Sequence, residues 1–156
     1  MSITVAFLTA DTGRLLRKRF DAMSRAHGAT GPQWRALAAL NRTPGMTQAA
    51  LAGWLEVEPI TAGRMIDRLE KSGLVERRAD PADRRAWRLY LAEGAAPILA
   101  ELQKLADQLH ADALAGLDQA ERDQLLNLLT RVRANLLDDA PYEIAAMPNA
   151  REGTDG

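Results

Sequence analysis

The chain has 156 residues, of which 47% are hydrophobic and 26% charged, a composition that fits one globular domain and excludes wholesale disorder. Aromatic residues make up only 4%, which favours a mostly helical core, and the absence of cysteine excludes disulfides, thiolate catalysis and cysteine-ligated zinc. Residues 1–91 hold 15 Lys and Arg against 9 Asp and Glu, whereas residues 92–156 hold 5 against 12, so the first part is suited to a polyanion unless the asymmetry only reflects uneven solvation of two surfaces.

Residues 5–26 are predicted to form the first helix, because apolar positions recur there at helical spacings with basic residues between them. Thr30 is followed by Gly, Pro and Gln, the order of a capping box with a proline in the first turn. The second helix should therefore begin after Thr30 and run to about Asn41. The apolar positions of the first helix are Leu8, Leu16, Phe20 and Met23.

Two helices are predicted next. After a Pro-Gly turn, Thr47 is a suitable N-cap for a short third helix over residues 48–55. Pro59 belongs to the first turn of a fourth helix, which should end at Gly73, because glycine is favoured just after the last helical residue.

The period changes after Gly73. Residues 74–78 and 86–91 read as two short strands, with Trp87, Leu89 and Leu91 on one face of the second. The connecting residues 79–85 are polar and charged, so we predict a hairpin with a charged tip.

Helical periodicity returns after Gly94 and should end near Gly116. Asp118 with Glu121 predicts the start of a last helix through a second capping box. Residues 139–156 show little periodicity and are predicted to form a flexible tail. The apolar positions are Ile98, Leu102, Leu105 and Leu109 in the first of these helices, and Leu125, Leu128, Leu129, Val132 and Leu136 in the second.

The order of the elements in residues 30–92 is that of a helix-turn-helix followed by a β wing. Its sequence resembles the MarR-type (multiple antibiotic resistance regulator) winged-helix transcription factors over about residues 5–137. The string between residues 67 and 85 is the most specific part. The stretches that carry the resemblance are GPQWRALAAL (31–40), TQAALA (47–52), RMIDRLEKSGLVERR (64–78) and DPADRR (80–85).

The resemblance implies a mainly α fold with a small β wing. Residues 1–29 and 93–138 would form a helical dimerisation region around a winged helix-turn-helix DNA-binding region at residues 30–92. It also implies a homodimeric repressor that binds a pseudo-palindromic operator in double-stranded DNA and is released by a small aromatic effector. Independently, the last helices carry more apolar positions than one stripe needs, which favours a dimer over an intrachain helical layer.

Two alternatives stay open at this point. One is a constitutive or activating DNA-binding regulator without small-molecule control. The other is a winged helix used as a protein-interaction module, against which the basic fourth helix and the Arg-tipped wing argue.

The fourth helix and its neighbour supply the first candidates for DNA contact. Arg64 and Arg68 lie one turn apart, and an arginine fork can read guanine, while small residues near them permit close approach to base edges. Alternatively, the two arginines pair with Asp67 or Glu70 on a solvated helix. Side chains at a helix N-terminus suit phosphate positioning. The expected contacts in this part are Thr47, Gln48, Thr61, Ala62, Gly63, Arg64 and Arg68.

The hairpin tip supplies Arg84 and Arg85, which suit a narrow minor groove. The alternative is a solvated turn held by Asp80 and Asp83. By the resemblance we expect Asp67 and Asp83 to orient arginines of the wing.

Glu58 departs from the expected pattern. It favours the helix dipole but repels a nearby phosphate backbone.

The resemblance places an effector between the dimer helices and the winged region. The candidates are three cations of the first helix with two aromatic walls, although each has a structural alternative: a solvated arginine, an exposed histidine at a helix end, or a core tryptophan. Peroxide sensing by thiol oxidation is excluded by the lack of cysteine. The candidate effector residues are Arg14, Arg17, Phe20, His27 and Trp34.

An enzyme is not expected. The sequence has no Gly-rich phosphate loop, nucleophile elbow or His-Glu metal motif, and its two histidines, His27 and His110, lie far apart. We therefore predict no catalytic residues, no metal site and no cofactor. Because no run of about 18 apolar residues exists, we expect a cytoplasmic protein without a membrane partner.

Overall fold

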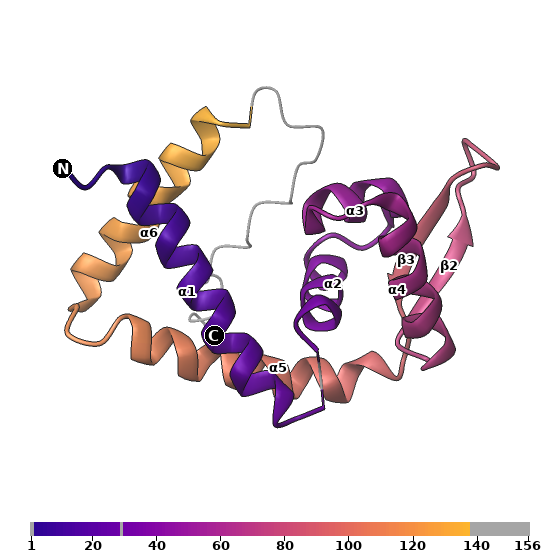
Figure 1. Cartoon of the computed structure of the whole chain (residues 1–156), viewed down its shortest axis with the longest axis horizontal. Helices are drawn as coiled ribbons and strands as arrows, with labels where there is room; N and C mark the ends of the chain where they lie inside the picture. Colours follow the sequence, from indigo (N-terminus) through magenta and orange to yellow (C-terminus); the bar gives the residue numbers. More distant parts are fainter. Residues whose placement is uncertain (1, 29, 138–156) are drawn as a thin grey trace, which may run out of the picture.

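The computed structural model describes residues 2–28 and 30–137. Most of them are helical, and one small sheet completes the fold, as predicted (Figure 1). The elements are α1 (Val5–Arg25), α2 (Gly31–Arg42), β1 (Met46–Thr47), α3 (Gln48–Leu55), α4 (Pro59–Lys71), β2 (Val75–Ala79), β3 (Trp87–Leu91), α5 (Ala95–Ala113) and α6 (Gln119–Asn135).

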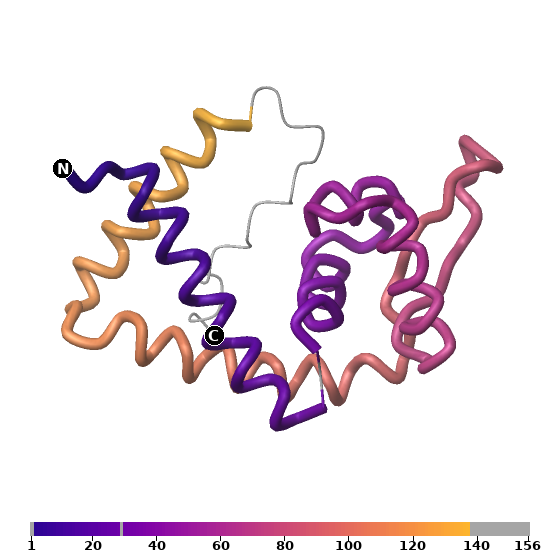
Figure 2. Tube along the Cα trace, in the orientation of Figure 1, coloured from indigo at the N-terminus to yellow at the C-terminus, as the bar shows by residue number. Residues whose placement is uncertain are grey.

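The molecule has two regions. Elements α2 to β3, residues 31–91, form a winged unit, and α1, α5 and α6 form a helical arm (Figure 1). Helix α1 contacts α5 and α2, and α5 also contacts α2, so these helices join the two regions. The tip of the β2–β3 hairpin projects from the winged unit at the side away from the N-terminus (Figure 2).

The predicted helix starts are confirmed by their caps. Thr47 Oγ1 accepts a hydrogen bond from the backbone N–H of Ala50 (3.1 Å). Asp118 Oδ1 accepts from the Glu121 N–H (2.8 Å), while the Glu121 carboxylate accepts from the Asp118 N–H (2.9 Å). Each bond satisfies a donor that a helix start would otherwise leave unpaired.

The helix ends also follow local chemistry. Gly73, just after the C-cap of α4, has φ of +74°, a conformation that favours glycine. Helix α5 ends at Ala113, before the predicted Gly116, which has φ of +88° in the turn that leads to α6.

The sheet has the antiparallel order β1-β3-β2. The hairpin was predicted, but β1 was not: Met46 pairs with Leu89 and Thr47 with Arg88. On the face predicted to be apolar, Leu89 is fully buried, whereas Trp87 is half exposed. The hairpin extends past the helices that cover its base (Figure 1), and residues 81–85 at its tip are exposed.

Two clusters make up the core of the described residues. The first fills the winged unit between α2, α3, α4 and the sheet, with Leu37, Leu40 and Ile66 at its centre. The second joins α1 to α5 through Phe20, Leu102 and Leu109.

Helix α6 belongs to neither cluster. It contains no buried residue, and its apolar side chains are exposed. Within the described residues α6 therefore covers no core, whereas α5 packs on α1 through Leu102 and Leu109.

Two further sequence predictions concern the C-terminal tail and membrane-spanning helices. The predicted tail, residues 139–156, lies outside the described residues. Within residues 2–28 and 30–137, no helix has the length and apolar character needed to cross a membrane.

Candidate nucleic-acid interface

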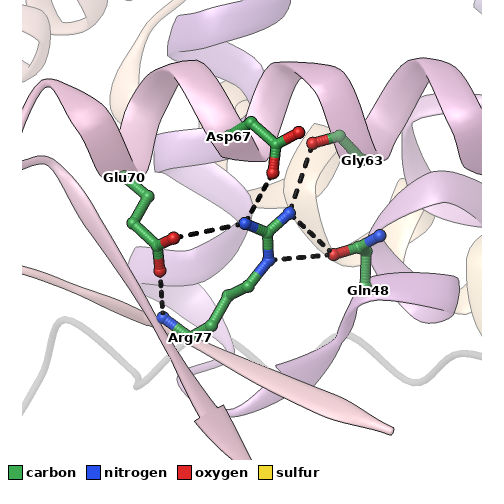
Figure 3. A network of polar contacts seen from close by, with 5 residues as sticks. All are labelled: Gln48, Gly63, Asp67, Glu70 and Arg77. Carbon is green, nitrogen blue, oxygen red and sulfur yellow. Dashed lines mark hydrogen bonds and ion pairs between the residues drawn. The ribbon is translucent and has the colours of Figure 1, made fainter. Parts of the chain in front are cut away.

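Arg77 on β2 holds together three elements of the winged unit (Figure 3). Its Nε and Nη2 both donate to Gln48 Oε1 at the start of α3 (3.3 Å each), and Nη2 also donates to the Gly63 carbonyl of α4 (3.3 Å). Its Nη1 lies 2.7 Å from Asp67 Oδ1 and 3.3 Å from Glu70 Oε1. The guanidinium thereby fixes the wing to α4 and to the N-terminus of α3.

The backbone strengthens the same connection. The Arg77 N–H donates to Glu70 Oε2 (3.0 Å), so Glu70 holds both the main chain and the side chain of one strand residue. The Arg77 side chain is 16% exposed, which reduces solvent screening of these contacts. We call Gln48, Gly63, Asp67, Glu70 and Arg77 the Arg77 network.

The Arg77 network bears on the alternative in which the α4 arginines pair with Asp67 or Glu70. Asp67 and Glu70, the partners expected in the solvated-helix alternative, both bind Arg77. Arg64 and Arg68 are exposed, and no ion pair within residues 2–28 and 30–137 involves them. Their charge is therefore available to an anionic partner. The expectation that Asp67 orients a wing arginine is confirmed, although that arginine lies on the strand and not at the tip.

One of the expected contacts is wrong. Ala62 is fully buried, because it shares the inward stripe of α4 with Met65, Ile66 and Leu69. Residues at i, i+3, i+4 and i+7 lie on one side of a helix. Ala62 therefore cannot approach a base edge, whereas Thr61 is exposed and Gly63 is partly exposed.

Gly63 serves close packing between α3 and α4. A Cβ at this position would lie 3.2 Å from Gln48 Nε2. Any side chain there would press on the amide that binds Arg77, so the small size of Gly63 protects the Arg77 network.

Thr47 and Gln48 both have internal roles. The Thr47 hydroxyl caps α3, and the Gln48 amide oxygen accepts from Arg77. Each side chain is only partly exposed. The Gln48 amide can still donate through its nitrogen, which makes it the better suited of the two to a phosphate.

The wing turn is held by its two aspartates. Asp83 Oδ1 accepts from the Arg85 N–H (2.9 Å), and Asp80 Oδ1 accepts from the Ala82 N–H (3.0 Å). Asp80 Oδ2 also lies 3.2 Å from Arg88 Nε. The hydrogen bond from Ala82 first, and then Arg88, keep the pKa of Asp80 below its ordinary value despite burial.

These hydrogen bonds fix the backbone of the turn, and Arg84 and Arg85 are exposed at its tip. Asp83 positions Arg85 through its backbone, as expected, and no ion pair within the described part of the chain occupies either guanidinium. The turn is therefore held by aspartates and still presents two cations to solvent.

A hollow of about 410 Å³ lies between α4 and the wing. Its lining includes Gln48, Glu70, Arg77 and Trp87. Neither Arg77 nor Trp87 was among the sequence candidates. The period of two places Arg77 on the same strand face as the apolar Val75, a signal that could have distinguished it from Arg78.

Only some of the effector candidates contact one another in the structure. Phe20 and Trp34 contact each other, with ring centroids 4.3 Å apart, and Trp34 Nε1 donates to Asp21 Oδ1 (2.7 Å). Arg14 pairs with Asp11 on its own helix (2.8 Å). Arg17 and His27 are exposed.

The described residues also bear on metal chemistry. They contain no group of three or more His, Asp or Glu side chains that could hold a metal ion. The partly or fully exposed candidate side chains include the guanidinium groups of Arg64, Arg68, Arg84 and Arg85, the amide of Gln48 and the hydroxyl of Thr61.

Comparison with known proteins agrees with the fold. The sequence model of the MarR family matches residues 30–87. The solved structure of the transcriptional regulator PA3341 is 32% identical, covers 85% of this chain and 98% of that chain, and has a TM-score of 0.72.

Two further solved structures are similar. Wild-type MarR from E. coli, in its apo form, is 26% identical, with 85% of this chain and 98% of that chain covered and a TM-score of 0.73. A MarR transcriptional regulator from Methanosarcina mazei Go1, 24% identical over 85% of this chain and 96% of that chain, shares the fold with a TM-score of 0.74.

Proposed function

The chain belongs to the MarR family of DNA-binding transcription regulators, and from this premise we propose that it is a ligand-responsive repressor that binds a pseudo-palindromic operator as a homodimer. In this proposal α4 enters the major groove, and the wing tip reaches the adjacent minor groove or backbone. A small aromatic effector releases the repressor from DNA.

One observation carries the DNA-binding part. The exposed cations Arg64 and Arg68 on α4, and Arg84 and Arg85 on the wing tip, have no acidic partner within the described residues, while the nearby Asp67 and Glu70 bind Arg77. A protein-interaction module would not need unpaired cations on both elements. The Arg77 network supports a fixed spacing between them.

The homodimer is supported by the helical arm. The apolar side chains of α6 and of the N-terminal part of α1 are exposed, and they make a surface that a second copy could cover. Two copies would also supply the two recognition helices that a pseudo-palindromic site requires. The exposed apolar residues are Ile3, Val5, Phe7, Leu8 and Leu15 near the N-terminus, Leu125, Leu126, Leu128, Leu129 and Val132 on α6, and its C-cap residue Leu136.

For the effector we propose a site where α1 meets α2. Arg17 and His27 would attract an anionic group, with Arg14 nearby once it leaves Asp11, and Phe20 and Trp34 would form the apolar walls. This position suits control, because α1 belongs to the proposed dimer region while Trp34 belongs to the winged unit.

A second candidate function is a regulator without small-molecule control. The contact between the Phe20 and Trp34 rings, and the hydrogen bond from Trp34 to Asp21, favour it. An effector at this place must separate the rings or bind beside them.

The test is fluorescence anisotropy of the full chain on the DNA upstream of its own coding sequence, with a random duplex as reference and the salt concentration fixed. We expect tighter binding to the upstream DNA, and release by one member of a panel of aromatic acids, aldehydes and thioesters. Specific binding that no compound changes would favour the second candidate. Equal binding to both duplexes would contradict a DNA-reading role and favour the interaction module.

A matched pair of variants tests the interface itself. Arg64→Ala removes one proposed base contact, whereas Lys104→Ala removes one positive charge from α5, where Lys104 pairs with Glu101 (2.9 Å). We expect only Arg64→Ala to weaken specific binding by more than the loss of one charge explains.

A further inference from the structure

Ile60 is an apolar side chain on the outer face of α4. It is 70% exposed, against 42% for Trp54 and 48% for Trp87, the other exposed large hydrophobic residues of the described winged unit. It occupies the second position of the helix, next to the exposed Thr61. None of the contacts assigned so far uses it.

The helical period places Ile60 opposite the core. With 3.6 residues per turn, Ala62 lies about 200° round the helix from Ile60 and Leu69 about 180°. Arg64 lies only about 40° from Ile60 and Lys71 about 20°. Ile60 therefore shares its face with Arg64 and Lys71, which have no acidic partner within the described residues, and with Asp67, about 20° away, whose carboxylate binds Arg77. The buried stripe faces away.

We propose that Ile60 reads a thymine, through contact between its aliphatic side chain and the thymine 5-methyl group in the major groove. This inference rests on the proposed function, which it deepens by giving one determinant of the operator. The cations around Ile60 favour a polyanionic partner, and the thymine methyl is the apolar group that B-DNA displays on base edges in that groove. A polyanion without an apolar group at this position would leave Ile60 in water.

The spacing along α4 also limits where that thymine lies. Four residues of helix span about 6 Å, and successive base pairs are about 3.4 Å apart. The thymine should therefore lie within about two base pairs of the guanine read by Arg64. The operator half-site thus contains a thymine and a guanine at a short, fixed separation.

The experiment removes a single methyl group from the DNA. A duplex is selected from a random library with the full-length protein, and each thymine is then replaced in turn by deoxyuridine, which differs only by that methyl. Anisotropy at fixed salt gives Kd for the wild type, Ile60→Ala, Ile60→Val and Arg64→Ala. Because Ile60 is mostly exposed, its replacement leaves the core intact, and circular dichroism verifies this.

We expect one thymine in the half-site at which deoxyuridine weakens wild-type binding about four-fold, the effect of one methyl-sized apolar group. Ile60→Ala should lose this sensitivity. Ile60→Val should keep much of it, and Arg64→Ala should keep it while losing discrimination at the guanine.

Two results would overturn the inference and leave the proposed function standing. In one, no thymine is sensitive to deoxyuridine although Arg64→Ala loses specificity, which would assign Ile60 to sugar carbons of the backbone or to solvent. In the other, Ile60→Ala keeps the full sensitivity, so that a different residue reads the methyl. If no sequence is enriched over random DNA, the proposed function itself fails, and the inference fails with it.

Discussion

The winged unit and helix α6 of the helical arm differ in whether their apolar residues are buried. In the winged unit Leu37, Leu40 and Ile66 are at most 1% exposed and pack together inside one chain. In and just after α6 the comparable residues are exposed: Leu126 is 63% exposed, and Leu136, the C-cap residue, is 75% exposed. The first region has a closed core, whereas α6 exposes apolar side chains that a second copy would cover in the proposed dimer.

The largest expected effect comes from charging that surface. Leu126→Glu combined with Leu129→Glu should convert a dimer into a monomer, because carboxylates cannot be buried cheaply in an apolar interface. Specific DNA binding should fall about 10²- to 10⁴-fold, as two recognition helices no longer act together. Light scattering and anisotropy measure the two results.

The control for this variant is Asn127→Glu, which adds a charge at a neighbouring exposed position of the same helix. It should leave the dimer intact. If the double variant remains dimeric, the exposed face of α6 is not the interface.

Arg77→Ala should break the connection between the wing and α4. The change removes the partner of Asp67, Glu70 and Gln48 and leaves two carboxylates unpaired at the proposed DNA-binding surface. We expect a loss of about 1–3 kcal/mol in the free energy of unfolding. DNA binding should weaken about ten-fold or more, because repulsion from phosphates adds to the loss of order.

Urea denaturation and anisotropy measure the two effects of Arg77→Ala. Arg78→Ala is the matched control, since Arg78 is exposed, pairs with Glu76 and lies over the Tyr90 ring. Similar effects of the two substitutions would show that the Arg77 network has no special part in the interface.

Arg64→Ala should act on sequence recognition and leave stability unchanged. We expect a loss of about 1–3 kcal/mol at one base position, with a much smaller loss on random duplex. Arg85→Ala should instead weaken binding more uniformly and alter the preference beside the wing. Equal losses on specific and random DNA would remove the base-reading role of Arg64.

The turn of the wing should depend on pH through Asp80. Its pKa in the folded protein lies below the ordinary value of 3.8, so the ionised form is favoured by folding. The stabilisation is complete above pH 3.8 and is lost as the pH falls through the lower folded-state value.

Asp80→Asn tests this pH dependence. The variant should be less stable than the wild type at neutral pH, and the difference should shrink below pH 3.8. Urea denaturation at pH 7 and pH 3 measures it, and a constant difference at both values would contradict the assignment.

Glu58→Gln should have the smallest effect. Glu58 is the exposed N-cap residue of α4, and its side chain makes no capping hydrogen bond. Removing its charge should raise affinity for random duplex about two-fold at low salt, and the gain should decrease with added salt. Unchanged affinity would place the Glu58 carboxylate away from the phosphates.

Much of the fold was predictable because its signals are local. Thr47, Asp118 and Gly73 act on residues within four positions of themselves, so the chain order alone reveals the starts and ends of their helices. Strand β1 escaped prediction because it has two residues and exists through pairing with β3, about 40 positions away. A strand so short has no period to detect.

The site was harder to predict because it depends on which way side chains face. Ala62 and Gly63 are equally small, but about 100° of helix rotation separates a core position from one at the surface. Attention to the stripe of Ala62, Met65, Ile66 and Leu69 would have identified Ala62 as buried. Arg77 and Arg78 differ in the same way on a strand. Asp67 pairs with Arg77 and not with Arg64, and only the folded structure reveals this choice.

The single guanidinium of Arg77 also bears on how such a regulator can be switched. Arg77 of β2 contacts both α3 and α4, so these three elements should move together as one rigid body. In the proposed dimer the two winged units would be joined through their helical arms. The distance between the two α4 helices could then change while each winged unit keeps its shape. An effector bound at the helical arm would then act on the spacing between the two α4 helices. That spacing would match or fail to match one turn of the double helix, without any change in how a single α4 contacts DNA.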